Sequence, residues 1–280
     1  MKIFKSLATI ALALFLTFMP AKSLGKEHSK KIPILMYHSI DYGKGVMSVT
    51  PENFRSHLEK LYDKGYVTAK LEDIILDKIK SEKPVVLRFD DSRASQFRYV
   101  KDGKGNTMID KKCAVGIILD FYQQHKEFGK HAIFFVIPHV EFHQPEYTKQ
   151  KLEFLLKEGM EIGNHGYYHE DLTYAKPEDI DKNFGKAMHR FEQILGENAK
   201  RIRIIATPYG SEPKYAETKK ELREFKWQGK KYKTLGIVYA YGKYNKLCPS
   251  RSSEKFNQYE LPSLEVTNKN FDKIMDMLKD

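Results

Sequence analysis

The sequence predicts an α/β fold in which about seven parallel strands alternate with helices in one distorted (β/α) barrel. Short apolar runs of strand length recur along the chain, and segments with helical spacing separate them. No internal repeat or linker divides the chain, and 280 residues suffice for one large domain. A doubly wound open sheet is the alternative, but the first strand–helix turn lacks the glycine fingerprint of a dinucleotide site.

The composition is that of a globular protein, with 41% hydrophobic and 30% charged residues. The net charge of +11 suits anionic surroundings such as a cell envelope or acidic polymers. No nucleic-acid-binding motif accompanies this charge, so we expect no nucleic acid partner.

Residues 1–25 have the pattern of a secretory signal peptide. Lys2 and Lys5 precede an apolar run at 6–19, which is too short to span a bilayer comfortably, and small residues follow. We therefore expect a folded domain at 26–280, secreted or held in the periplasm or envelope of a bacterium. An uncleaved anchor is the alternative, and the mature protein has no predicted transmembrane segment.

The elements of the first half follow from local signals. An apolar strand at 32–38 ends in a histidine, after which Thr50 caps a helix that has Pro51 in its first turn and ends at Gly65. Two strands with a short helix between them come next, at 66–69, 71–79 and 85–89. The turn signal at 102–106 then predicts a hairpin insertion within 92–112.

The second half continues the alternation. Glycines end two of its predicted helices, at Gly159 and Gly196, and Thr267 caps the last one. The remaining predicted strands are 132–137, 160–163, 202–206 and 235–240. The other predicted helices are 114–128, 147–158, 177–195 and the strongly charged 213–226.

The polar residues that could carry chemistry come directly after the apolar runs: His38, the pair Asp90 and Asp91, His165, and Tyr209. In a parallel barrel these positions converge on one face, where the active site lies. Two adjacent carboxylates repel each other unless a positive group lies between them, and a metal ion is the simplest such group.

His165 and His169 are four residues apart. On a helical turn that spacing puts both imidazoles on one side, where they could hold one divalent ion. Together with one carboxylate they make an Asp-His-His site that leaves positions open for water and substrate. Such a set also suits iron oxygenases.

Five motifs come in an order that resembles the polysaccharide deacetylase family, the NodB-like enzymes of carbohydrate esterase family 4. They are Leu35-Met36-Tyr37-His38-Ser39-Ile40, Leu87-Arg88-Phe89-Asp90-Asp91-Ser92, Ala132-Ile133-Phe134-Phe135-Val136, Glu161-Ile162-Gly163-Asn164-His165 with His169-Glu170-Asp171-Leu172, and Pro208-Tyr209-Gly210. The opening motif is similar to that of the circularly permuted branch that includes the poly-N-acetylglucosamine deacetylases.

The resemblance implies a role for each motif. It makes Asp90 the general base that activates a metal-bound water, and His38 the acid that protonates the leaving amine. The metal ligands would be Asp91, His165 and His169. The metal would be zinc, with cobalt, nickel or iron as alternatives. The Tyr209 backbone N–H would bind the oxyanion, and the substrate-binding residues would be Pro208, Tyr209 and Tyr37.

Two positions depart from the family pattern. Ala206 stands where the family has an arginine that orients the base. Arg88 lies two residues before Asp90, on the same face of a strand, and is our candidate substitute, with Arg203 and Arg251 as competitors. Gly166 stands where the family has Ser or Thr, which suggests a looser loop.

The expected activity is hydrolysis of acetamido groups on an N-acetylated polysaccharide: poly-N-acetylglucosamine, peptidoglycan or a chitin-like polymer. The alternatives are a non-catalytic carbohydrate-binding barrel that keeps the metal site, and an O-acetyl esterase. Cys113 and Cys248 could form a disulfide or remain two free thiols.

Overall fold

A computed structural model describes residues 31–278, and the predicted signal peptide lies outside them. Its main sheet is parallel throughout and has the strand order β14-β11-β10-β9-β6-β2-β16, with β5 beside the first residues of β6. The predicted α/β fold and its roughly seven parallel strands are therefore confirmed. The strands are β2 (Ile34–Tyr37), β5 (Val67–Thr68), β6 (Pro84–Phe89), β9 (Ile133–Val136), β10 (Glu161–Asn164), β11 (Ile204–Ala206), β14 (Gly236–Val238) and β16 (Leu264–Glu265).

The sheet curls until its two ends share one segment, so the fold is a distorted barrel rather than a doubly wound open sheet. The Leu261 N–H donates to Ile237 of β14, and the Tyr239 N–H donates to the carbonyl of Leu261. Three residues later, Leu264 of β16 pairs with Leu35 of β2. Residues 261–265, which we call the closing segment, thus connect β14 to β2.

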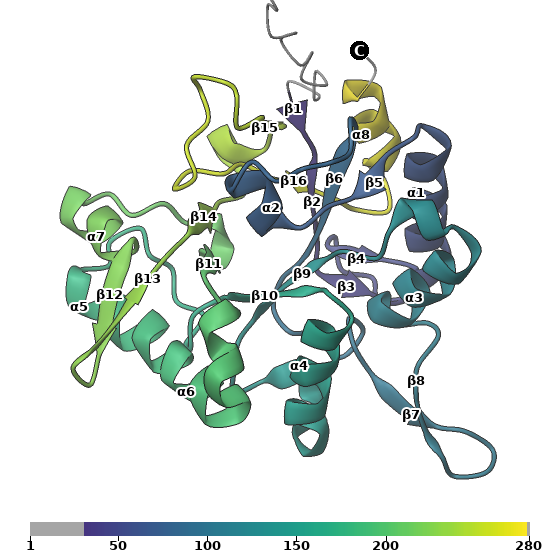
Figure 1. Ribbon diagram of the computed structural model, residues 1–280, viewed down its shortest axis with the longest axis horizontal. Coiled ribbons are helices and arrows are strands. Elements are labelled where there is room, and N and C mark those ends of the chain that lie inside the picture. Colours follow the sequence, from purple (N-terminus) through teal and green to yellow (C-terminus); the bar gives the residue numbers. More distant parts are fainter. Residues whose placement is uncertain (1–30, 279–280) are drawn as a thin grey trace, which may run out of the picture.

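Helices cover the outside of the curled sheet, where α1, α3, α4 and α6 follow one another around it (Figure 1). The α-helices are α1 (Pro51–Asp63), α2 (Leu71–Ile75), α3 (Ala114–Gln124), α4 (Thr148–Lys157), α5 (Pro177–Ile180), α6 (Lys186–Leu195), α7 (Ala216–Glu221) and α8 (Phe271–Met277). A π-helical turn, η4 (Asp181–Gly185), joins α5 to α6, so the predicted helix at 177–195 forms with one wider turn. The Thr50 hydroxyl caps α1 by accepting from the Asn53 N–H at 3.2 Å.

The smaller strands form paired ribbons at the edges of the barrel. They are β1 (Lys31–Ile32), β3 (Ser39–Ile40), β4 (Ser48–Val49), β7 (Tyr99–Lys101), β8 (Thr107–Ile109), β12 (Glu224–Trp227), β13 (Lys230–Lys233) and β15 (Cys248–Pro249). The β7–β8 hairpin confirms the predicted insertion and projects from the body at the lower right of Figure 1.

Two predicted elements are wrong in part. The helix expected at 213–226 is only the short α7, because the chain turns at Gln228 and Gly229, both at positive φ, to pair β12 with β13. The last helix begins at Phe271 rather than behind Thr267, and Asn270 binds the Thr267 N–H at 2.8 Å instead.

Alternation along the strands divides the buried residues into two cores. Odd-numbered residues of β6, such as Leu87 and Phe89, pack with Tyr37 and Phe134 in a large cluster. Even-numbered Val86 belongs to a smaller cluster inside the barrel, where it packs with Ile34, Ile133, Phe135, Ile204, Ala206, Val238 and Leu261. Successive strand residues face opposite sides, so positions 86, 88 and 90 follow one another along the inner face toward the carboxyl end.

Both cysteines are buried free thiols, so the structure contains no Cys113–Cys248 disulfide. Among residues 31–278, no helix combines the length and apolar character needed to cross a membrane.

Candidate active site

The register of the sheet brings the carboxyl ends of four neighbouring strands, β2, β6, β9 and β10, to one level. The Asp90 N–H donates to the carbonyl of Tyr37 at 3.1 Å, which places Asp90 beside His38. The His165 N–H donates to the carbonyl of Val136 at 3.1 Å. Polar residues that are more than 120 positions apart in sequence therefore meet at the carboxyl edge of the barrel.

Asp91, His165 and His169 gather their donor atoms within 4.8 Å of one another. Oδ1 of Asp91 lies 3.1 Å from Nε2 of His169 and 3.4 Å from Nε2 of His165. Nδ1 of His165 lies 2.9 Å from the carbonyl oxygen of Ala206, to which it donates, and this bond leaves the lone pair of Nε2 available to a metal ion. One carboxylate and two imidazoles are a donor set that fits a divalent transition metal.

The loop that carries the histidines is not helical, in contrast to our prediction. It is irregular, with Gly166 at φ 76° and His169 at φ 53°. Oδ1 of buried Asn183 ties the loop down by accepting the N–H groups of Tyr167 at 2.6 Å and Tyr168 at 2.9 Å. A Cβ at position 166 would come within 2.7 Å of the same oxygen. Glycine is therefore needed here, and the loop is held tightly rather than loosely.

Arg88 binds Asp90 with both arms of its guanidinium. Nε lies 2.8 Å from Oδ1, and Nη2 lies 2.5 Å from Oδ2. Nη1 donates to Oγ of Ser263 at 2.7 Å, and Ser263 belongs to the closing segment. Burial alone would raise the pKa of Asp90, but the charges of Arg88 and His165 outweigh it, and the pKa of this carboxyl lies below its ordinary value.

The two competing arginines lie elsewhere. Arg203 forms an ion pair with Glu72, and the guanidinium of Arg251 lies 5.0 Å from the centre of the Phe256 ring. Of the three candidates, Arg88 is thus the one in contact with Asp90.

His38 lies near both carboxylates and is buried, with 7% of its surface exposed. Burial is the main influence on its pKa and lowers it, while Asp90 and Asp91 act in the opposite direction. Its Nδ1 has no hydrogen-bond partner within the described part of the chain. Most buried polar atoms in folded proteins have a hydrogen-bond partner, so this nitrogen is a feature of the site that calls for an explanation.

Tyr37 contradicts our prediction of a substrate-binding role. Its side chain is fully buried and its ring stacks on Phe89. Its hydroxyl oxygen lies 3.3 Å from Nδ1 of His57. The reason is alternation along β2, because Met36 and His38 line the cavity whereas Tyr37 faces the helices.

The Pro-Tyr-Gly segment folds as a single turn beside the histidines. Tyr209 has a positive φ of 57°, is 62% exposed, and packs edge-to-face with the His169 ring at a centroid distance of 4.6 Å. Pro208 is buried and does not line the cavity, in contrast to the substrate-binding role that we predicted for it.

A cavity of about 450 Å³ opens above these groups. Its wall includes three residues that we did not predict, Met47, Arg93 and Tyr241. They come from loops after β3, β6 and β14, and no local sequence signal marks them. Burial, with a smaller influence of Glu265, raises the pKa of Tyr241, which keeps its hydroxyl protonated.

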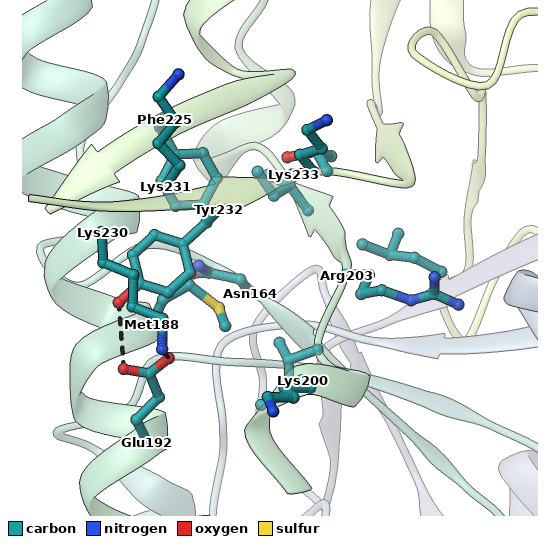
Figure 2. A pocket seen from close by; sticks show the side chains of 14 residues that line it. Asn164, Met188, Glu192, Lys200, Arg203, Phe225, Lys230, Lys231, Tyr232 and Lys233 are labelled. Atoms are coloured by element: carbon teal, nitrogen blue, oxygen red, sulfur yellow. Dashed lines mark hydrogen bonds and ion pairs between the residues drawn. The ribbon is translucent and has the colours of Figure 1, made fainter. Parts of the chain in front are cut away.

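A second cavity, of about 300 Å³, lies between α6, the start of β11 and the β12–β13 hairpin (Figure 2). Its carboxylate, Glu192, is bound by Lys230 and lies 3.2 Å from the Tyr232 hydroxyl (Figure 2). Lys231 and Lys233 pair with Glu224. The charged groups of this second cavity are thus engaged in ion pairs, whereas the first cavity combines His38 with the Asp-His-His set.

Comparison with solved structures supports the fold. The Streptococcus pyogenes deacetylase PplD, solved in complex with acetate, matches with a TM-score of 0.65 and 18% identity over 89% of this chain and 99% of that chain. A de-N-acetylase from Aggregatibacter actinomycetemcomitans matches with a TM-score of 0.59 and 15% identity over 88% of this chain and 99% of that chain.

Comparison of sequences identifies the family. YxkH of Bacillus subtilis (strain 168), which carries the name of a polysaccharide deacetylase, is 27% identical over 188 residues, a match that covers 66% of this chain and 58% of YxkH. A family model described as polysaccharide deacetylase matches residues 77–229, which is more than half of the chain. The chain therefore belongs to the polysaccharide deacetylase family.

Proposed function

We propose that this protein is a metal-dependent polysaccharide N-deacetylase, which hydrolyses acetamido groups of an N-acetylated envelope or biofilm polymer such as poly-N-acetylglucosamine, peptidoglycan or a chitin-like glycan. One observation carries the proposal: Asp91, His165 and His169 converge beside the arginine-bound Asp90 at the foot of a cavity of about 450 Å³. The cavity has room for a sugar ring. The fold shared with a de-N-acetylase and the family membership support it.

Asp91, His165 and His169 would hold the ion, with zinc as our first choice and cobalt, nickel or iron as alternatives. A divalent ion bound there would polarise the acetamide carbonyl and lower the pKa of a water molecule. This help matters because an amide carbonyl is a poor electrophile.

Asp90 is the proposed general base. Its pKa below the ordinary value keeps it ionised at neutral pH, so it can take the proton of the attacking water. The bidentate contact with Arg88 fixes the direction of its oxygens. Arg88 would thereby orient the base, which is the role of the arginine that the family has at the position of Ala206.

The remaining steps fall to His38 and Tyr209. The backbone N–H of Tyr209 would donate to the oxygen that becomes negative when the water attacks. His38 would then give a proton to the nitrogen, because an amine leaves readily only after protonation. Acetate and a free amine on the sugar are the products.

We also propose that residues 26–280 form one secreted or envelope-bound bacterial domain. The apolar segment at 6–19 and the net charge of +11, which suits anionic envelope polymers, support this localisation.

The test is to incubate the purified protein with zinc or cobalt and with chitooligosaccharides, poly-N-acetylglucosamine or peptidoglycan, and to measure acetate and free amine. We expect both products in equal amounts, and their loss in Asp90→Asn. Acetate without amine would show ester cleavage instead. Retained sugar binding without acetate from any polymer would make the protein a binding barrel.

A further inference from the structure

The two oxygens of Asp91 have different neighbours. Oδ1 faces His165 and His169, at 3.4 and 3.1 Å from their Nε2 atoms. Oδ2 is taken by Arg93, with Nη2 at 2.8 Å and Nε at 3.3 Å. One oxygen thus points into the proposed metal centre, and the other is held outside it.

A strained turn produces this arrangement. After β6 the backbone adopts positive φ at two consecutive non-glycine residues, Asp91 at 75° and Ser92 at 52°. Each costs about 1–2 kcal/mol relative to ordinary backbone, so the surrounding structure must enforce the turn. Buried Ser92 does so, because its Oγ accepts the Ile137 N–H at 2.8 Å and fixes the turn to the end of β9.

The turn brings Arg93 back beside Asp91, two residues earlier. The Arg93 side chain is 52% exposed and lines the cavity mouth, whereas that of Asp91 is 12% exposed. An ion pair between two exposed side chains contributes little. Here Asp91 is largely shielded from solvent and held by a strained backbone, so the contact fixes the orientation of its carboxylate.

The orientation matters because a carboxylate can give a metal one oxygen or both. If both oxygens bound, the ion would lose a coordination position that a catalytic site needs for water and substrate. A donor that occupies Oδ2 prevents this. Groups that orient a ligand in this way commonly change metal affinity by about 10–100-fold when they are removed.

We propose that Arg93 is a positioning residue that holds Asp91 as a one-oxygen ligand and so keeps a coordination position of the metal open. This inference rests on the proposed metal site. It concerns a residue that touches neither the ion nor the reacting atoms.

The chain offers a matched control. Arg98 binds Oδ2 of Asp110 through Nε and Nη2 in the same way, and its side chain is 44% exposed. This pair lies by the β7–β8 hairpin, away from the cavity. Arg98→Ala therefore removes an equivalent ion pair without touching the proposed centre.

The experiment compares the wild type, Arg93→Ala, Arg93→Lys and Arg98→Ala, each loaded with cobalt(II), whose visible absorption weakens as its coordination number rises. We expect a weaker spectrum for Arg93→Ala alone, a partial return in Arg93→Lys, and no change in Arg98→Ala. Competition with a chromophoric chelator should give a zinc dissociation constant that is changed by about tenfold for Arg93→Ala and is that of the wild type for Arg98→Ala.

Two outcomes would overturn the inference, and they differ. If Arg93→Ala bound cobalt and zinc as Arg98→Ala does, Arg93 would have no positioning role while the metal site stood. If the wild type bound neither ion, the metal site itself would be wrong, and this inference with it.

Discussion

Arg88 and Asp90 form a two-armed ion pair inside the barrel, with Nε to Oδ1 at 2.8 Å and Nη2 to Oδ2 at 2.5 Å. Both side chains are almost wholly buried, so water does not weaken the contact. The third nitrogen of Arg88 holds Ser263, so the orientation of Asp90 depends on the closing segment.

We predict that Arg88→Lys folds but loses activity. A lysine brings one compact charge and cannot bind both oxygens, so Asp90 is left misdirected. A misplacement of this kind can cost on the order of 100-fold in kcat. Acetate release under saturating polymer measures it, and undiminished kcat would contradict the role of Arg88. Arg88→Ala should also lower the free energy of unfolding by about 3–5 kcal/mol, since it leaves a buried charge unpaired.

Arg55 provides the control for that variant. It pairs with Asp120 at 2.5 Å, but the two side chains are 33% and 42% exposed. Arg55→Ala should change the free energy of unfolding by less than about 1 kcal/mol, as exposed pairs do. Urea unfolding of both variants makes the comparison.

Metal removal should abolish acetate release and lower thermal stability. Ligands that bind only the folded state stabilise it, by about 2.7 kcal/mol when zinc stands at 100 times its dissociation constant. We expect zinc to restore both properties after chelation. In Asp91→Ala it should restore neither, because one of the three donors is gone. Melting temperatures with and without zinc are the measurement, and an equal shift in Asp91→Ala would exclude this site.

The acid role of His38 predicts a pH dependence. A general acid works only when protonated, so kcat/KM should fall as pH rises through the pKa of His38, which burial lowers below the ordinary value of about 6.5. His38→Gln should lose this limb of the profile and about 100-fold or more in rate. His131→Gln is the control, because His131 is a partly buried histidine at the other end of β9. A profile that is unchanged in His38→Gln would assign the acid to another group.

Lys151 predicts a pH dependence of stability. Its ammonium is buried among the rings of Phe97, Tyr99 and Phe142, at 5.7, 6.0 and 5.6 Å from their centres. Burial lowers its pKa from 10.5 to about 8. Between these values the unfolded chain binds a proton that the folded chain does not, so folding is favoured as pH rises from about 8 to 10.5.

We therefore expect the wild type to gain stability relative to Lys151→Met across that window. The comparison cancels the titration of the tyrosines, which both proteins share. Lys149→Met, on the exposed side of the same helix, should show no such trend. Urea unfolding at pH 7, 8, 9 and 10 checks this, and parallel curves for the wild type and Lys151→Met would contradict it.

Much of the barrel could be predicted because short apolar runs and helical spacing are local signals. The site residues His38, Asp90, Asp91 and His165 could be predicted because each ends such a run. Tyr37 was misassigned although a signal was present. A tyrosine between two inward-facing residues of a strand must face outward.

Other parts depend on contacts that the sequence does not display. The histidine loop takes its shape from Asn183, which lies in a π-helical turn fourteen residues beyond His169. Arg93 reaches Asp91 only because Ser92 is fixed to β9. The β12–β13 hairpin could not be predicted, because the Lys and Glu residues on its exposed face are equally common on the exposed face of a helix.

The closing segment, which completes the barrel, lies outside the part of the chain that sequence similarity detects. The family match at 77–229 contains the base and all three proposed ligands. It omits β2 with His38, and it omits Ser263, which lies between the two contacts that join the sheet ends. A fragment cut at the boundaries of the match would keep most of the chemical groups but would leave both sheet edges bare and the base without its distant support.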